Sequence, residues 1–129
     1  MVEDKKQLLQ QLLELSNTDV RKCMQCGRCS GACPAAMMMD VLPHRMVWEL
    51  AMGNPEVVLA AKSPFSCLSC GACVQRCPRG VAPGAIMEAA RLMHIRQQGG
   101  EYLHPDMLTE IDPEMPQQLL VAAFRKFVK

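Results

Sequence analysis

The chain has 129 residues and a formal net charge of +1, which allows one domain with short extensions and argues against a dedicated nucleic-acid binder. Half of the residues are hydrophobic but only 4% are aromatic, so the eleven methionines are expected to fill much of the core. The sequence contains no run of 18 apolar residues and no apolar signal segment at its start. We therefore expect no direct membrane insertion and a location in the cytoplasm.

Helices are predicted along most of the chain. A stripe of five leucines predicts a first helix over residues 4–16. Prolines at the first helical position predict helices over residues 43–52 and 55–61, with Asn54 as the N-cap of the second. A longer helix is expected over residues 83–97 because its apolar positions recur at helical spacing.

The C-terminal part is predicted to be a linker over residues 100–115 followed by a helix over residues 116–128. That helix places Leu119, Leu120 and Phe124 on one side. No segment alternates convincingly between apolar and polar residues as a half-buried strand does. The predicted fold class is therefore all-α.

All eight cysteines fall in two runs with the same spacing. The first is Cys23-Met-Gln-Cys26-Gly-Arg-Cys29-Ser-Gly-Ala-Cys33-Pro34, and the second, 44 residues later, is Cys67-Leu-Ser-Cys70-Gly-Ala-Cys73-Val-Gln-Arg-Cys77-Pro78. Each reads C-x2-C-x2-C-x3-C-P, the spacing of bacterial proteins with two iron–sulfur clusters, in which the fourth cysteine ligates the other cluster. The runs therefore predict two [4Fe–4S] clusters.

The crossing rule assigns four predicted ligands to each cluster. They are Cys23, Cys26, Cys29 and Cys77 for cluster 1, and Cys67, Cys70, Cys73 and Cys33 for cluster 2. Structural zinc is a less favoured alternative, because its usual spacing of paired cysteines needs neither the third cysteine of each run nor the following proline. A disulfide framework is disfavoured in a reducing compartment.

Residues beside the cysteines are expected to shape and tune the clusters. Gly27 and Gly71 let the backbone approach the inorganic sulfides and adopt a positive φ. Pro34 and Pro78 stop each loop after its fourth cysteine. The stretches around the runs contain cations and no acid, which should favour cluster reduction unless these cations simply face solvent. The cations are Arg21, Lys22, Arg28, Lys62, Arg76 and Arg79.

Other residues carry weaker predictions. Candidates to shield the clusters from water are Met37, Met38, Met39, Phe65 and Val74. Trp48 is expected in the core, and the three histidines, His44, His94 and His104, are expected to be surface or helix residues without a partner constellation. The sequence has no nucleotide-binding or catalytic motif, so we expect no catalytic site of its own.

The cysteine runs and their helical setting resemble the C subunits of heterodisulfide reductases. They are also similar to the α-helical ferredoxin domain of fumarate reductase and succinate dehydrogenase iron–sulfur subunits. The resemblance covers about residues 5–98, and the eight cysteines match the ligands of the family one for one. It implies an α-helical ferredoxin-like dicluster domain over residues 1–99, with residues 100–129 as a helical extension that can dock a partner.

The same resemblance implies a function. In that family, the C subunits relay electrons between a flavoprotein subunit, which also carries clusters, and a cysteine-rich cluster subunit that reduces the disulfide. The motifs of the cysteine-rich subunit are absent from this sequence. We therefore expect an electron-transfer subunit of an oxidoreductase complex. The alternatives are a free-standing dicluster ferredoxin that serves several enzymes, and a redox-sensing interaction module.

Overall fold

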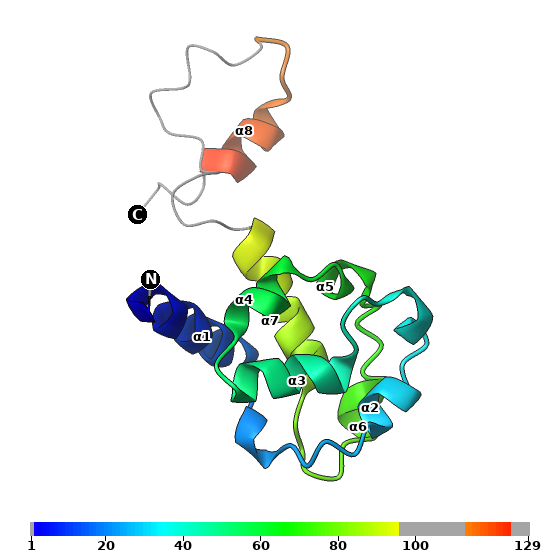
Figure 1. The fold of residues 1–129 in the computed structure, drawn as a ribbon. Helices are drawn as coiled ribbons and strands as arrows, with labels where there is room; N and C mark the ends of the chain where they lie inside the picture. Colours follow the sequence, from blue (N-terminus) through cyan, green and yellow to red (C-terminus); the bar gives the residue numbers. More distant parts are fainter. Residues whose placement is uncertain (1, 96–112, 125–129) are drawn as a thin grey trace. The chain divides into compact units, whose positions relative to one another are not determined.

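The computed structural model describes residues 2–95 and 113–124. These residues form helices and no strand, which confirms the all-α prediction (Figure 1). The chain divides into two units, Met1–Ile95 and Arg96–Lys129. None of the described helices combines the length and the hydrophobicity that a membrane crossing needs.

Four longer helices build the first unit, and all four were predicted. They are α1 (Val2–Ser16), α3 (Pro43–Ala51), α4 (Pro55–Ala60) and α7 (Pro83–Ile95). Helix α1 packs against α4 and α7, and α3 packs against the same two helices (Figure 1). Gly53 ends α3 with a φ of 76°, a conformation that costs glycine little.

Helix α4 begins where the sequence predicts, but the predicted N-cap residue makes different hydrogen bonds. Asn54 stands at the N-cap position, but its side chain makes no capping hydrogen bond. Instead its Nδ2 donates to Glu49 Oε2 at 3.1 Å, and its Oδ1 accepts from Lys5 Nζ at 3.1 Å. The same lysine pairs with Glu56 at 2.6 Å. Asn54 therefore ties α1 to α3 instead of satisfying the backbone of α4.

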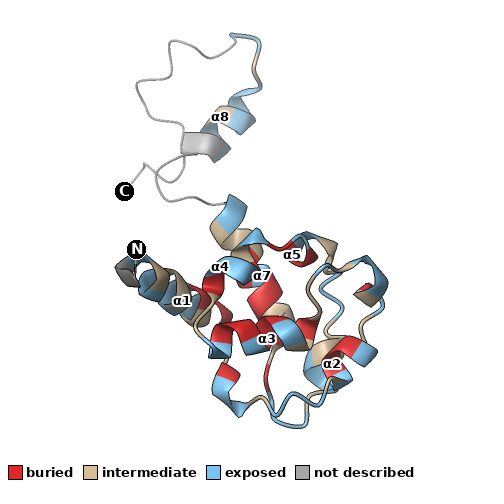
Figure 2. Ribbon diagram, in the orientation of Figure 1, coloured by how far each residue is buried: buried red, intermediate tan, exposed pale blue. Residues whose placement is uncertain are grey.

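The core of the first unit lies where α1, α3, α4 and α7 meet (Figure 2). Its buried members are Leu12, Val20, Met46, Val47, Leu50, Val58, Ala61, Val81, Ile86, Met87, Ala89 and Ala90. Met46 and Met87 are almost fully buried, so methionine fills space that aromatic rings occupy in other cores. The prediction that Trp48 is a core residue is wrong, because it is 36% exposed and its ring lies 4.6 Å from the guanidinium of Arg45.

Five short helical segments were not predicted, because three or four residues are too few to show a hydrophobic period. They are η1 (Val20–Lys22), α2 (Arg28–Gly31), η2 (Ala36–Met38), α5 (Ser63–Ser66) and α6 (Ala72–Gln75). Helices α2 and α6 lie side by side, which brings the two cysteine runs together (Figure 1). The helical spacer between the runs thus folds back on itself.

Asp40 joins the two ends of this spacer. Its carboxylate accepts hydrogen bonds from the backbone N–H groups of Lys62 and Ser63, both at 2.9 Å, and from the Ser63 hydroxyl. These bonds, with that from the Lys62 N–H first, lower the pKa of Asp40 to about 2. Ser63 is completely buried and begins α5, the helical turn that leads into the second cysteine run.

Replacing Asp40 with alanine should lower the free energy of unfolding by about 1–3 kcal/mol, because the buried N–H and hydroxyl of Ser63 lose their acceptor. The pKa of Asp40 is lower in the folded protein, so its contribution is present above about pH 4 and lost as the pH falls toward about 2. Urea unfolding of both cluster-loaded proteins at pH 7 tests this, because acid protonates the thiolates that hold the clusters. Glu88→Ala, an exposed change on α7, should stay within about 0.5 kcal/mol of the wild type. Equal stability of Asp40→Ala and the wild type at pH 7 would contradict the assigned role.

The second unit is described only in part. Its helix α8 spans Gln117–Phe124, within the helix predicted over residues 116–128. Leu119 and Val121 are exposed, and Leu120 is half-buried. The predicted linker lies mostly outside the described residues, as do the last five residues of the chain. The division into a dicluster domain and a docking tail stays a prediction.

Candidate metal centre

The two cysteine runs repeat each other in backbone conformation as well as in spacing. Gln25 and Ser69, the residues before the second cysteine, have φ values of 54° and 53°. Gly27 and Gly71, the residues after it, have φ values of 73° and 74° and stand at the N-caps of α2 and α6. The predicted positive φ of both glycines is confirmed. A Cβ at either position meets no protein atom within 4 Å, so the positive φ is the feature of the described chain that favours glycine here. The predicted approach of the backbone to the inorganic sulfides stays a prediction.

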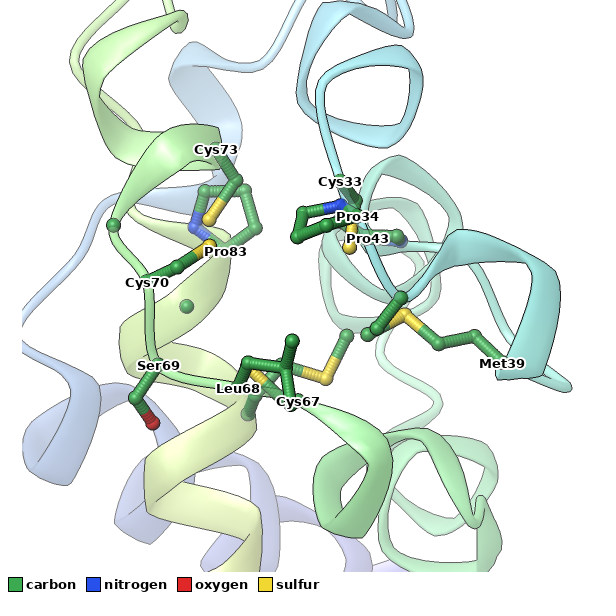
Figure 3. A pocket seen from close by; sticks show the side chains of 14 residues that line it. Cys33, Pro34, Met39, Pro43, Cys67, Leu68, Ser69, Cys70, Cys73 and Pro83 are labelled. Atoms are coloured by element: carbon green, nitrogen blue, oxygen red, sulfur yellow. The ribbon is translucent and has the colours of Figure 1, made fainter.

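One pocket brings the second run together with the last cysteine of the first run. It is lined by Cys67, Cys70 and Cys73, and by Cys33 from the opposite side (Figure 3). The other lining residues are mostly apolar and include Met39 and Met87. We call this the second pocket, after the run that supplies three of its cysteines.

Another cavity of the same kind contains the remaining four cysteines. Cys23, Cys26 and Cys29 of the first run line it together with Cys77, the last cysteine of the second run. We call this the first pocket. Each pocket therefore contains three cysteines of one run and the fourth of the other, which is the grouping that the crossing rule predicts. The assignment of these thiols as ligands of particular clusters stays a prediction.

The donor set fits a thiolate-bound cluster, because four thiols line each pocket. All eight cysteines are free thiols. Among the described residues, no three His, Cys, Asp or Glu side chains converge as the ligands of a single metal ion do.

Two helix N-termini point toward the pockets, and neither was predicted to do so from the sequence. Pro43, at the start of α3, lines the second pocket, and Pro83, at the start of α7, lines both pockets. Next to it, a Cβ on Gly84 would lie 3.3 Å from Cys73 Sγ, so the backbone closely approaches this sulfur. The positive end of a helix dipole stabilises an anionic group such as a thiolate-bound cluster. The sequence signal that could have indicated these helix N-termini is the proline that begins a helix shortly after each cysteine run.

Backbone and side-chain donors surround several of the sulfur atoms. Burial raises the pKa of the Cys29 thiol, and hydrogen bonds from Ser30 oppose that rise. Burial likewise raises the pKa of Cys73, opposed by a hydrogen bond from the Gly84 N–H. The Val81 N–H donates to Cys77 Sγ at 3.3 Å. Donors of this kind stabilise the anionic thiolate, the form that binds iron.

The predicted cations separate into different environments. Arg28 and Arg79 line the first pocket. Arg21 is exposed and paired with Asp19 at 3.0 Å, a contact that lowers the pKa of this carboxyl. Lys22, Lys62 and Arg76 are exposed and line neither pocket. All six cations are exposed, and only Arg28 and Arg79 also line a pocket. The tuning role predicted for Arg28 and Arg76 remains a prediction.

The shielding prediction is only partly right. Met39 lines the second pocket, but Met37 and Met38 are 97% and 72% exposed, and they line neither pocket. Phe65 and Val74 are also exposed and are absent from both linings. The prolines that follow the runs do line the cavities, Pro34 the second pocket and Pro78 the first.

His44 contradicts the expectation that the histidines have no partner constellation. It lines the first pocket, its Nδ1 lies 2.7 Å from Ser30 Oγ, and its backbone N–H donates to the same oxygen at 3.1 Å. Ser30 itself is buried next to Cys29. This connection joins the start of α3 to the first run and depends on tertiary contacts between distant segments.

Comparison with known proteins agrees with the cysteine pattern. A family model described as a 4Fe-4S dicluster domain matches residues 22–82. The C subunit of the ferredoxin:CoB-CoM heterodisulfide reductase of Methanosarcina mazei is 34% identical over 85 residues, which is 65% of this chain and 52% of that protein. A protein of Archaeoglobus profundus, described as similar to the C subunit of heterodisulfide reductase, is 31% identical over 90 residues. The match covers 69% of this chain and 48% of that protein.

A relative with the same description as the Methanosarcina mazei protein, from Methanosarcina acetivorans, is 37% identical over 76 residues, covering 59% of this chain and 30% of that protein. The chain thus spans about half the length or less of these curated relatives. A dicluster domain with eight cysteines carries two [4Fe–4S] clusters.

Proposed function

We propose that this chain, whose residues 22–82 are a 4Fe-4S dicluster domain related to the C subunits of heterodisulfide reductases, is the electron-transfer subunit of a heterodisulfide reductase-type complex. In this proposal Cys23, Cys26, Cys29 and Cys77 hold cluster 1, and Cys67, Cys70, Cys73 and Cys33 hold cluster 2. Each [4Fe–4S] cluster, when bound, supplies a one-electron carrier.

The main support for the proposal is that the two four-cysteine pockets are adjacent and have one lining residue in common. Pro83 is fully buried and lines both pockets, so one side chain separates the two groups of thiols. The second pocket is lined mostly by apolar residues and cysteines, with Ser69 as its polar residue. Two adjacent one-electron sites suit a relay between other subunits.

We propose as partners a flavoprotein subunit on one side and a cysteine-rich, disulfide-reducing cluster subunit on the other. The relationship to C subunits of CoB-CoM heterodisulfide reductases supports this choice. The exposed apolar residues of α8, Leu119 and Val121, provide a surface that a partner subunit can cover. We place the complex in the cytoplasm, where thiols stay reduced.

Substitution of one cysteine in each pocket tests the relay. In the purified complex, Cys26→Ser and Cys70→Ser should each abolish electron transfer from flavin to disulfide, while flavin reduction by the electron donor persists. The control is Met37→Ser, which changes an exposed side chain outside both pockets and should leave the transfer rate unchanged. The rates are measured by rapid mixing under anaerobic conditions.

Full flavin-to-disulfide transfer in both cysteine variants would overturn the proposal. Native-size chromatography from the source cells separates the relay subunit from a free-standing ferredoxin. A stable large complex supports the former, and migration as a small monomer supports the latter.

A further inference from the structure

Gln25 connects the first cysteine run to helix α3. Its side-chain Nε2 lies 3.3 Å from Cys23 Sγ and 3.1 Å from the backbone oxygen of His44. Its backbone N–H also donates to Cys23 Sγ, at 3.4 Å. One residue therefore supplies two hydrogen bonds to a single sulfur of the first pocket.

The partners of the Gln25 side chain determine which end of its amide faces the sulfur. A backbone carbonyl only accepts hydrogen bonds, and so does a thiolate. The amide nitrogen, with its two hydrogens, can satisfy both acceptors, whereas the amide oxygen would be repelled by each of them. The N–H groups therefore point toward Cys23 Sγ and His44 O.

His44 is in turn held in place from the other side of the loop. Ser30 Oγ contacts both the ring Nδ1 and the backbone N–H of His44, at 2.7 and 3.1 Å. Because Ser30 is buried, the carbonyl that orients Gln25 has little freedom to move. Ser30 and His44 therefore keep the Gln25 N–H oriented toward Cys23 Sγ, so the donor needs no rearrangement when a bound cluster gains an electron.

The corresponding position in the second run is different. Ser69 has nearly the same backbone φ as Gln25, but its Oγ accepts a hydrogen bond from Arg91 Nη2 at 2.7 Å. In Figure 3 the Ser69 hydroxyl points away from the sulfur atoms of the second pocket. A serine side chain also has no amide group to donate to Cys67.

The pockets also differ in the charged residues that line them, and this difference too favours reduction in the first pocket. Arg28 and Arg79 line the first pocket, whereas none of the described residues lining the second pocket is charged. Arg91 contacts Ser69 but does not line the second pocket. Nearby cations and N–H···S hydrogen bonds both favour the reduced, more negative state of a cluster.

We propose that the two centres are unequal, that the cluster in the first pocket has the higher reduction potential, and that Gln25 is the positioning residue that helps to set it. The proposal rests on the two-cluster assignment above. An electron shared by the two sites then resides mainly in the first pocket, which gives the relay a downhill direction from the second pocket to the first.

The test is a redox titration of the purified, cluster-loaded full chain, reduced by one electron per cluster with dithionite and followed by electron paramagnetic resonance. Gln25→Met keeps the length of the side chain and removes its donors. It should make the equilibrium constant for reduction of one cluster about tenfold less favourable, a shift of about 59 mV to lower potential. Gln25→Asn, which is too short to reach the sulfur, should shift the same cluster in the same direction.

Ser69→Met is the matched control, 44 residues away in the repeat and at the same backbone φ. It should leave the cluster that responds to Gln25→Met unchanged. Cys26→Ser identifies the spectrum of the first pocket by altering it, and Cys70→Ser identifies that of the second. The Gln25 and Ser69 variants are compared with the wild type at equal iron content.

Unchanged potentials in fully loaded Gln25→Met and Gln25→Asn would overturn the proposal, as would a lower wild-type potential in the first pocket than in the second. An equal shift from Ser69→Met would also overturn it, because the effect would then be nonspecific. These titrations need no partner protein, so they can fail while the relay function holds. Loss of the relay function in the complex would likewise leave these potentials unaffected.

Discussion

Replacing Cys77 with serine should perturb the same cluster as replacing Cys26, although the two residues belong to different runs. Both line the first pocket, whereas Cys33 lines the second pocket with Cys70. Cys33→Ser should therefore match Cys70→Ser. Loss of one thiolate from a four-cysteine site should remove an iron or the whole cluster, so we expect the iron content to fall by up to half.

The measurement compares the paramagnetic resonance and iron content of all four variants. Under crossed ligation the altered signals pair as Cys26 with Cys77 and Cys70 with Cys33. Ligation within each run would pair them as Cys26 with Cys33 and Cys70 with Cys77, and that result would refute the proposed assignment. Ser66→Ala, beside the run but outside both pockets, serves as the control and should retain both signals.

Removal of iron from the protein should have the second large effect, a loss of fixed tertiary structure. Metal–thiolate binding in small domains contributes about 10–16 kcal/mol for zinc, which equals or exceeds the total stability of about 5–15 kcal/mol of a typical domain. By comparison, Leu12→Ala, the deletion of a fully buried side chain, should cost about 2–5 kcal/mol. We therefore expect the iron-free protein to be unfolded or molten.

The local structure of the runs gives the reason for this sensitivity. Helices α2 and α6 contain four residues each, far fewer than an isolated helix needs. Cys26 and Cys70 are exposed and contribute nothing to the apolar core. Without iron, the loops retain few interactions that oppose their conformational entropy.

Amide hydrogen exchange and binding of a hydrophobic dye test this prediction before and after anaerobic chelation of iron. Fluorescence of Trp48, the only tryptophan, is a poor probe because this side chain is already partly exposed. Restoring iron and sulfide should recover slow exchange in α7. Slow exchange and cooperative unfolding in the iron-free protein would contradict the prediction.

Hydrophobic period predicted α1 and α7, and a proline at the first helical position predicted α3 and α4. Neither signal reveals the short helices, since one turn shows no period, and the prediction for Trp48 was wrong. A tryptophan can cover the core with one edge and stack on Arg45 with its face, and this outcome depends on how α3 is rotated. Asn54 stands at the predicted N-cap position, but its side chain binds Glu49 and Lys5, which belong to other helices and could not be foreseen from the local sequence.

The sequence by itself determined the cofactor class and the positive φ of the glycine in each cysteine run. The spacing of the cysteines and the glycine after the second of them are local properties, so the repeat could be recognised without knowing the fold. The positive φ of Gly27 and Gly71 follows from the same local signal. Only the tertiary structure brought α2 beside α6, which places Cys33 and Cys77 in opposite pockets.

The tertiary structure also decided how the two pockets differ. The approach of His44 to Gln25, the position of Pro83 between the cavities and the contact of Gly84 with Cys73 join residues separated by long stretches of chain or by a helix end. Such contacts depend on how α3 and α7 pack on the core, and they leave no periodic pattern in the sequence. The repeated runs predict two similar centres, and the packing of unlike helices around them makes the centres different.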